Sequence, residues 1–157
     1  MLCDRQVTKL LDGKVSHLPE YLVASEGGYI GCLGFTSAGF AEQARQAARR
    51  GFLPGSEGGG FGQNDVAVPS FMAWRKEAEA GRCLDSALAC LGVIASQAFQ
   101  ATGRAAPPRL RPLLAALREA SPPADGPVAP ADGAAAVERL IRGKVFAGDR
   151  AAPPAAA

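Results

Sequence analysis

Residues 86–103 read SALACLGVIASQAFQATG, and none of these 18 residues carries a formal charge. The main apolar stripe of residues 83–102 has helical spacing and comprises Leu84, Ala87, Leu88, Leu91, Ile94, Ala95 and Ala98. Cys90 and Val93 widen this stripe, so we expect the helix to be buried on more than one side. A membrane-spanning helix needs about 20 mainly apolar residues. The uncharged run contains serine, glutamine and threonine, and we therefore expect the central helix of a small protein and no membrane segment.

Two further helices are expected before this central one. The first follows Thr36 or Ser37, which can cap it, and Gly51 ends it after two arginines. Its apolar stripe consists of Phe40, Ala44, Ala47 and Ala48. The second begins at Ser70, and we expect Gly81 to break it.

The N-terminal third predicts β-structure. Residues 5–11 and 14–18 flank Asp12-Gly13, a dipeptide that favours a type I′ hairpin turn. Residues 20–25 and 29–35 form a second expected strand pair, joined by a turn at residues 26–28. Gly31 and Gly34 in the last strand indicate a bulge or a close backbone approach. The pattern predicts an antiparallel β-meander.

Proline and alanine divide the chain near residue 105. Nine of the 12 prolines follow that residue, and alanine and proline supply 26 of the last 53 residues. Within this tail, Leu110, Leu113, Leu114 and Leu117 have the spacing of a helix that docks on the core. We thus predict an α+β fold: a globular domain over residues 1–104, with the meander followed by a small helical bundle, and a docked helix over residues 105–120. We expect residues 121–157 to form a Pro/Ala-rich linker, a short basic amphipathic helix and a disordered end.

Several function classes are disfavoured by composition. The net charge of +2 lacks the dense basic footprint of a strong nonspecific nucleic-acid binder. The four cysteines form no C-x-x-C pair and His17 is the only histidine, so we expect no metal site and no cofactor. The N-terminus shows no apolar signal run. We therefore expect a cytoplasmic protein with reduced thiols.

Two motifs suggest chemistry, and each has a simpler interpretation. The glycine-rich loop at residues 55–62 lacks the Lys-Ser/Thr pair that follows a P-loop, and we expect a surface loop. A Cys–His nucleophile would need His17 to activate Cys32 or Cys83, with the thiolate of Cys83 favoured near a helix start. Nothing in the sequence brings these residues together, so a cysteine-dependent enzyme is kept only as the second alternative function.

The remaining candidates are contact surfaces. We predict a small non-enzymatic accessory protein, an adaptor or inhibitor that binds another protein. The first alternative is a DNA-binding regulator that uses the meander and the basic first helix. A homodimer through the helix at residues 83–102 is a further expectation. The tethered C-terminal helix either docks on a partner or packs on its own core. The predicted partner-binding residues are Arg45, Arg49, Arg50, Val137, Arg139, Leu140, Ile141, Arg142 and Lys144.

Overall fold

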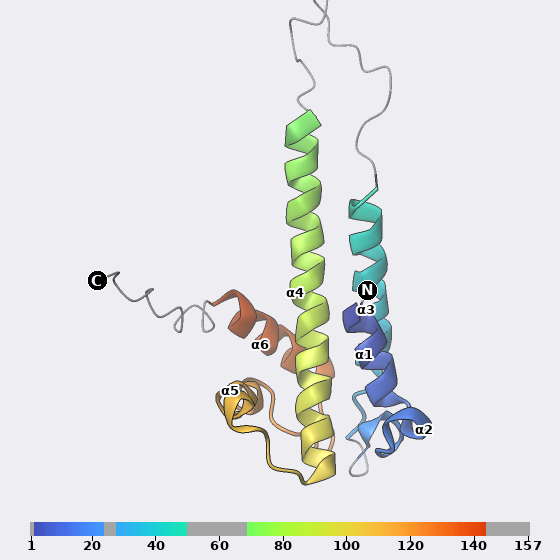
Figure 1. Ribbon diagram of the computed structural model, residues 1–157, viewed down its shortest axis with the longest axis vertical. Helices are drawn as coiled ribbons and strands as arrows, with labels where there is room; N and C mark the ends of the chain where they lie inside the picture. The colour runs from blue at the N-terminus through green and yellow to red at the C-terminus, as the bar shows by residue number, and fades with distance from the viewer. Residues whose placement is uncertain (1, 24–27, 50–68, 144–157) are drawn as a thin grey trace, which may run out of the picture.

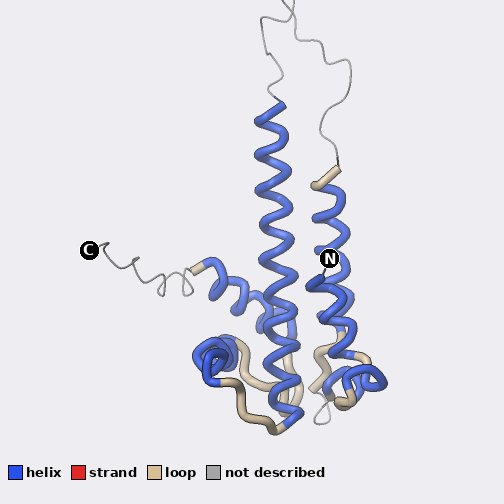
Figure 2. Tube along the Cα trace, in the orientation of Figure 1, coloured by secondary structure: helices blue, strands red, loops and turns tan. Residues whose placement is uncertain are grey.

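The computed structural model describes residues 2–23, 28–49 and 69–143, and every regular element within these ranges is a helix (Figure 2). The glycine-rich loop and the predicted disordered end lie outside the described residues. In chain order the elements are α1 (Leu2–Leu11), α2 (Gly13–Ser16), η1 (Glu20–Leu22), α3 (Cys32–Ala47), α4 (Pro69–Thr102), η2 (Pro108–Leu110), α5 (Arg111–Ala120) and α6 (Pro130–Arg142).

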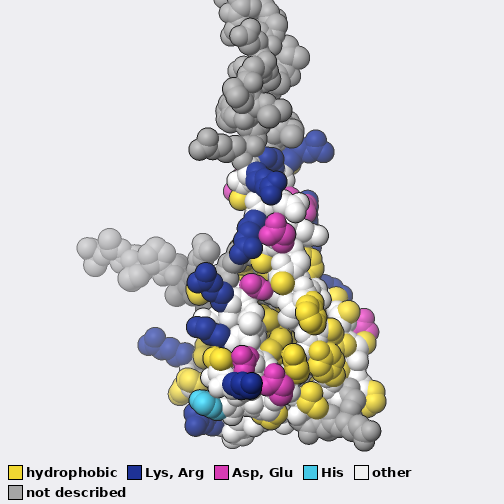
Figure 3. Space-filling model, turned by 90° about the vertical axis from the view of Figure 1, so that its right-hand side faces the viewer, with side chains coloured by type: hydrophobic (Ala, Val, Ile, Leu, Met, Phe, Trp, Pro, Cys, Tyr) yellow, Lys and Arg dark blue, Asp and Glu magenta, His cyan; other side chains and the backbone are white. Residues whose placement is uncertain are grey.

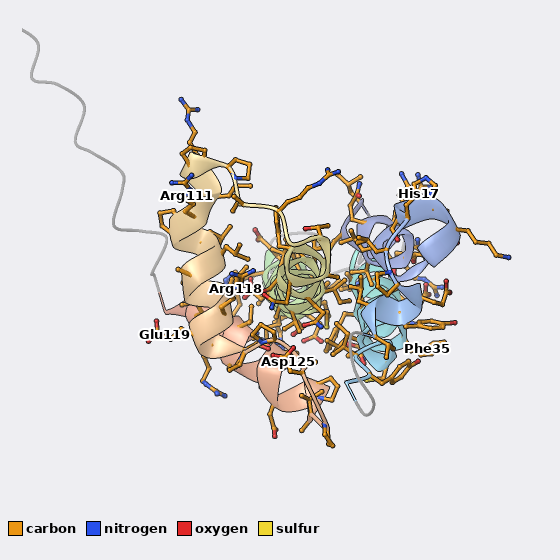
Figure 4. The ribbon with its side chains drawn as sticks, turned by 90° about the horizontal axis from the view of Figure 1, so that it is seen from below. His17, Phe35, Arg111, Arg118, Glu119 and Asp125 are labelled. Atoms are coloured by element: carbon orange, nitrogen blue, oxygen red, sulfur yellow. The ribbon has the colours of Figure 1, made fainter. Side chains whose placement is uncertain are left out.

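The long helix α4 is the centre of the molecule (Figure 1). It runs antiparallel to α3, and α1 packs against both of them. On the other side of α4 lie α5 and α6, as the view along the α4 axis shows (Figure 4). Ala87, Cys90 and Ile94 are among its fully buried residues. Residues 83–102 lie in this central helix and are buried on more than one side, as predicted. The helix begins earlier, at Pro69, and Leu84 and Leu88 of the predicted apolar stripe are exposed, at 44% and 37%.

The predicted N-terminal meander is wrong, because its first strand is the helix α1. Cys3, Val7 and Leu11 are buried, and their spacing of four residues places them on one helical face. Val7 and Thr8 are β-branched and favour a strand locally, whereas Cys3 completes the apolar face of a helix. Packing of this face on α4 and α3 overrides the weak local β-preference.

Asp12-Gly13 was predicted to form a hairpin turn, and instead it begins the short helix α2. The Asp12 carboxylate accepts hydrogen bonds from the backbone N–H groups of Lys14 and Val15, at 2.9 and 3.3 Å. Aspartate is favoured both in turns and at helix N-caps, because its side chain accepts from nearby backbone N–H groups. The dipeptide alone therefore does not distinguish the two structures.

Residues 29–35 were predicted as a strand, but Cys32 begins α3. The glycines mark a close backbone approach, which was one of the two expectations for them. A Cβ atom on Gly34 would lie 2.8 Å from Cδ1 of Leu11, and one on Gly31 would lie 2.6 Å from the hydroxyl of Tyr29. The missing side chains thus allow α1 and the Tyr29 ring to pack directly on the start of α3.

Gly81 was expected to end a helix, yet α4 continues through it. Gly81 has open space around its Cα, so the glycine accommodates no close neighbour. A glycine inside a helix costs about 1 kcal/mol relative to alanine. Tertiary contacts on both sides offset that cost, because Lys76 Nζ donates to the Arg49 carbonyl at 2.9 Å and Cys83 is buried.

The C-terminal helices complete the core. The leucine-spaced helix is confirmed as α5, with Leu114 and Leu117 buried. Between α5 and α6, the backbone N–H of Ala124 donates to Gln97 Oε1 at 3.0 Å, which holds the proline-rich connection on α4. Val137 of α6 has 0% exposure and belongs to the same hydrophobic core as Val7 and Ile94.

One helix of the described chain passes a length and hydropathy test for a membrane span. It is the segment Ala73–Thr102 of α4, with a mean hydropathy of 1.3 over its most apolar window. Half of that window is buried inside the protein, and the core helix of a soluble protein passes the same test. The cytoplasmic location stays a prediction.

Candidate functional site

Of the arginines predicted on the first helix, Arg45 lies in the C-terminal part of α3. Arg45 forms an exposed ion pair with Glu42 at 3.4 Å, which is one helical turn away. Arg49 is exposed just beyond the helix, and Arg50 lies outside the described residues. The β-sheet with which these arginines were expected to act on DNA is replaced by helices where the chain is described.

The residues predicted on the tethered helix lie in α6, whose apolar face packs on the chain's own core. Val137 is fully buried, and Leu140 and Ile141 are partly buried against the core. Arg142 bonds to Asp85 at 3.2 Å and to Glu138 at 2.6 Å. The other two predicted residues are Arg139, which is exposed, and Lys144, which lies outside the described residues. Partner binding by this set stays a prediction.

The cysteines are not arranged as a nucleophile. Cys83 lies deep inside α4, so no helix N-terminus favours its thiolate. Burial raises the pKa of the Cys83 thiol, and the Glu79 carboxylate raises it further. Burial also raises the pKa of Cys90 to about 11. Among the described contacts, His17 forms no hydrogen bond with any cysteine, and Cys32 is exposed.

A groove lies between α1, η1 and α3, and no motif in the sequence predicted it. Its volume is about 420 Å³, which falls within the range of small binding sites. Its lining residues come from three separate segments: Asp4, Thr8, Leu11 and Asp12; Glu20 and Tyr21; and Gly31, Gly34, Phe35 and Ala38. The close packing of Leu11 on Gly34 forms part of this lining and keeps α1 and α3 in contact.

Two aromatic side chains, Tyr21 and Phe35, line this groove and reach solvent, and Tyr29 lies next to Tyr21. The Phe35 side chain is 79% exposed, and Tyr21 and Tyr29 are each 44% exposed. The two tyrosine rings contact each other, with their centroids 5.8 Å apart and their planes tilted by 60°. Phe35 projects from α3 on the side of the molecule opposite to Arg111 and Glu119 of α5 (Figure 4). On the face shown in Figure 3, hydrophobic side chains gather over the lower part, and both acidic and basic side chains lie beside them.

The backbone that presents Tyr21 adopts an unfavourable conformation. His17, Tyr21 and Leu22 all have positive φ angles, between 53° and 57°. For residues other than glycine, this conformation costs about 1–2 kcal/mol each. Leu22 is fully buried in the core, and its N–H donates to the Pro19 carbonyl at 2.8 Å. Burial of Leu22 therefore anchors η1 and holds the neighbouring Tyr21 at the groove.

The charged side chains that line the groove are all acidic. Glu20 accepts a hydrogen bond from the N–H of Gly13 at 2.9 Å, and Asp12 caps α2. The Asp4 carboxylate forms no hydrogen bond or ion pair with another described residue. Asp4, Thr8 and Leu11 share one face only if the segment is helical. Their spacing was therefore the one sequence signal for this groove. It could not be recognised because the segment was predicted to be a strand.

The described part of the chain contains no group of three or more His, Cys, Asp or Glu side chains that could hold a metal ion. The groove is lined by acidic and aromatic side chains that three packed helical segments supply. Comparison of the chain with protein family models, with curated proteins and with solved structures finds no match.

Proposed function

We propose that this protein acts by binding another protein through the groove between α1, η1 and α3, without catalysing a reaction itself. The observation that carries the proposal is the exposure of Phe35, at 79%, beside a groove that also presents Tyr21. Burying a phenylalanine side chain contributes about 1.5–3 kcal/mol. A few aromatic residues supply most of the binding energy in many protein interfaces.

The groove is also preorganised for binding. Phe35 projects from a helix whose start packs on α1 through the Leu11–Gly34 contact. Tyr21 is held by the buried Leu22, so its backbone does not have to become ordered on binding. Preorganised aromatic side chains lose little conformational entropy in a complex, which raises affinity for a given buried area.

The alternative of DNA binding has no support from this surface. Asp4, Asp12 and Glu20 line the groove, and carboxylates repel a phosphate backbone. Arg45 lies further along α3 and is already paired with Glu42, and Arg49 lies just beyond the end of the helix.

Affinity capture from the native cells tests the proposal. The wild-type chain is compared with Phe35→Ala and with a control variant, Leu110→Ala. Leu110 is also an exposed apolar residue, at 43%, and it directly precedes α5 on the opposite side of α4. We expect Phe35→Ala to weaken binding of the purified main partner about tenfold or more, because hot-spot aromatics contribute at least 1–2 kcal/mol.

Two readouts decide the result. Circular dichroism must show that both variants keep the wild-type helix content, so that a loss of binding is local. Equal binding of the same partner by wild type and Phe35→Ala would refute the groove as the contact surface. Loss of binding by Leu110→Ala alone would place the contact on the α5 side and refute it as well.

A further inference from the structure

We infer that the groove binds a basic segment of the partner protein, in which an arginine side chain lies beside an apolar one. This inference rests on the proposed function and adds the chemistry of the partner to it. The observations that carry it are three carboxylates and two aromatic side chains in one groove lining, with no basic side chain among the lining residues.

The carboxylates provide the charge complementarity. Asp4 belongs to α1, Asp12 caps α2 and Glu20 begins η1, so three separate local structures bring negative charge to one place. Asp12 accepts backbone hydrogen bonds through Oδ1 and Glu20 accepts one through Oε2, and no contact within the described residues occupies their second oxygens. A cationic side chain in the groove would gain attraction from all three groups, and salt would screen part of it.

Basic residues of α1 do not neutralise this lining. Arg5 and Lys9 are exposed, and neither forms an ion pair within the described chain. They follow Asp4 and Thr8 by one position, which rotates them by about 100° around the helix axis, away from the face that lines the groove. The lining therefore keeps a net negative charge.

The aromatic residues favour arginine over lysine. Phe35 and Tyr21 both line the groove, and the face of an aromatic ring attracts a cation. A guanidinium group is planar, stacks on aromatic rings and bonds a carboxylate through two N–H groups at once. Leu11, Ala38 and the ring of Phe35 offer an apolar surface for the neighbouring side chain of the partner. A volume of about 420 Å³ suits a few side chains of a segment and not a whole domain.

Peptide binding to the full chain tests this inference. Three fluorescent helical peptides share the same leucines and differ at the adjacent polar positions, which carry arginine, lysine or glutamate. We expect the arginine peptide to bind tightest in fluorescence anisotropy, and at least about tenfold tighter than the glutamate peptide. Its dissociation constant should rise with NaCl concentration, because the attraction is electrostatic.

Matched charge variants locate the binding. Asp4→Asn and Glu20→Gln each remove one negative charge from the lining and keep the size of the side chain. Glu119→Gln removes the same charge from α5, on the far side of the molecule (Figure 4). We expect each groove variant to raise the dissociation constant of the arginine peptide about threefold to tenfold. The Glu119 variant should leave this constant unchanged.

The outcomes separate this inference from the proposed function. Equal affinity for the arginine and glutamate peptides would refute the basic-segment inference, as would equal effects of Glu20→Gln and Glu119→Gln. If none of the three peptides binds, but Phe35→Ala still abolishes binding of the natural partner, the inference is refuted and the proposed function is not. Natural-partner binding that does not depend on Phe35 would refute both.

Discussion

Replacing Val137 with alanine tests whether α6 belongs to the folded core. The valine side chain has 0% exposure, and a Cβ atom on Gly92 would lie only 3.1 Å from its Cγ1. This proximity places the valine methyl group against the backbone of the central helix α4. If α6 were instead free of the core, the same methyl groups would be in contact with water. Their removal would then not change the free energy of unfolding.

The expected destabilisation follows from that burial. Truncation of valine removes two methyl groups, each of which contributes about 0.8 kcal/mol when buried. The cavity that remains adds to the loss, because the surrounding side chains relax only partly. Alanine has a higher helix propensity than valine, which offsets about 0.5 kcal/mol of this loss in the free energy of unfolding. We therefore expect Val137→Ala to lower the free energy of unfolding by about 2 kcal/mol.

Urea denaturation followed by circular dichroism measures this change. The control is Val128→Ala, because Val128 lies in the connection before α6 and is 40% exposed. The control should change the free energy of unfolding by less than about 0.5 kcal/mol. Equal unfolding midpoints for wild type and Val137→Ala would refute the packing of α6 on α4, and would again support partner binding by Val137, Leu140 and Ile141.

Three shorter predictions concern other parts of the chain. Gly103 follows α4 with a φ of 59°, so Gly103→Ala should destabilise the protein by about 1 kcal/mol in thermal unfolding, and Gly103→Asn by less. Maleimide should label the exposed Cys32 first, and the buried Cys3, Cys83 and Cys90 only after urea is added; fastest labelling of Cys83 would contradict its burial. The pKa of Cys90 is raised from 9.0 to about 11 by burial, so the folded thiol keeps its proton when the unfolded thiol loses it. Its contribution to stability is complete below pH 9 and is lost as the pH rises towards 11, by up to about 3 kcal/mol. The difference in unfolding free energy between wild type and Cys90→Ala should therefore shrink over this range, and a constant difference would refute the raised pKa.

Several helices could be predicted from the sequence, because a helical pattern is contained within one short segment. The uncharged residues 86–103 predicted the buried half of α4, and the spacing of Leu110, Leu113, Leu114 and Leu117 predicted α5. In both segments large apolar residues recur every three or four positions, and no competing period fits them.

The N-terminal third could not be predicted in the same way, since its local signals are shared between two structures. Asp12-Gly13 suits a hairpin turn and a helix cap, and Gly31 and Gly34 suit a bulged strand and a close helix contact. The structure resolves the choice through long-range packing: Leu11 meets Gly34, and the Cys3 thiol donates to the Ala87 carbonyl at 3.2 Å.

The groove depends even more on that packing. Asp4, Tyr21 and Phe35 belong to three separate elements, and no spacing in the sequence relates them. The period of the apolar residues shows which face of a helix is apolar, because the period and the face depend on the same few neighbouring residues. It contains no information on which faces meet, since that depends on side-chain shapes and backbone clearances between residues far apart in the chain. The helical pattern of residues 86–103 and of α5 is thus a property of local sequence, whereas the acidic and aromatic groove exists because α1, η1 and α3 pack together.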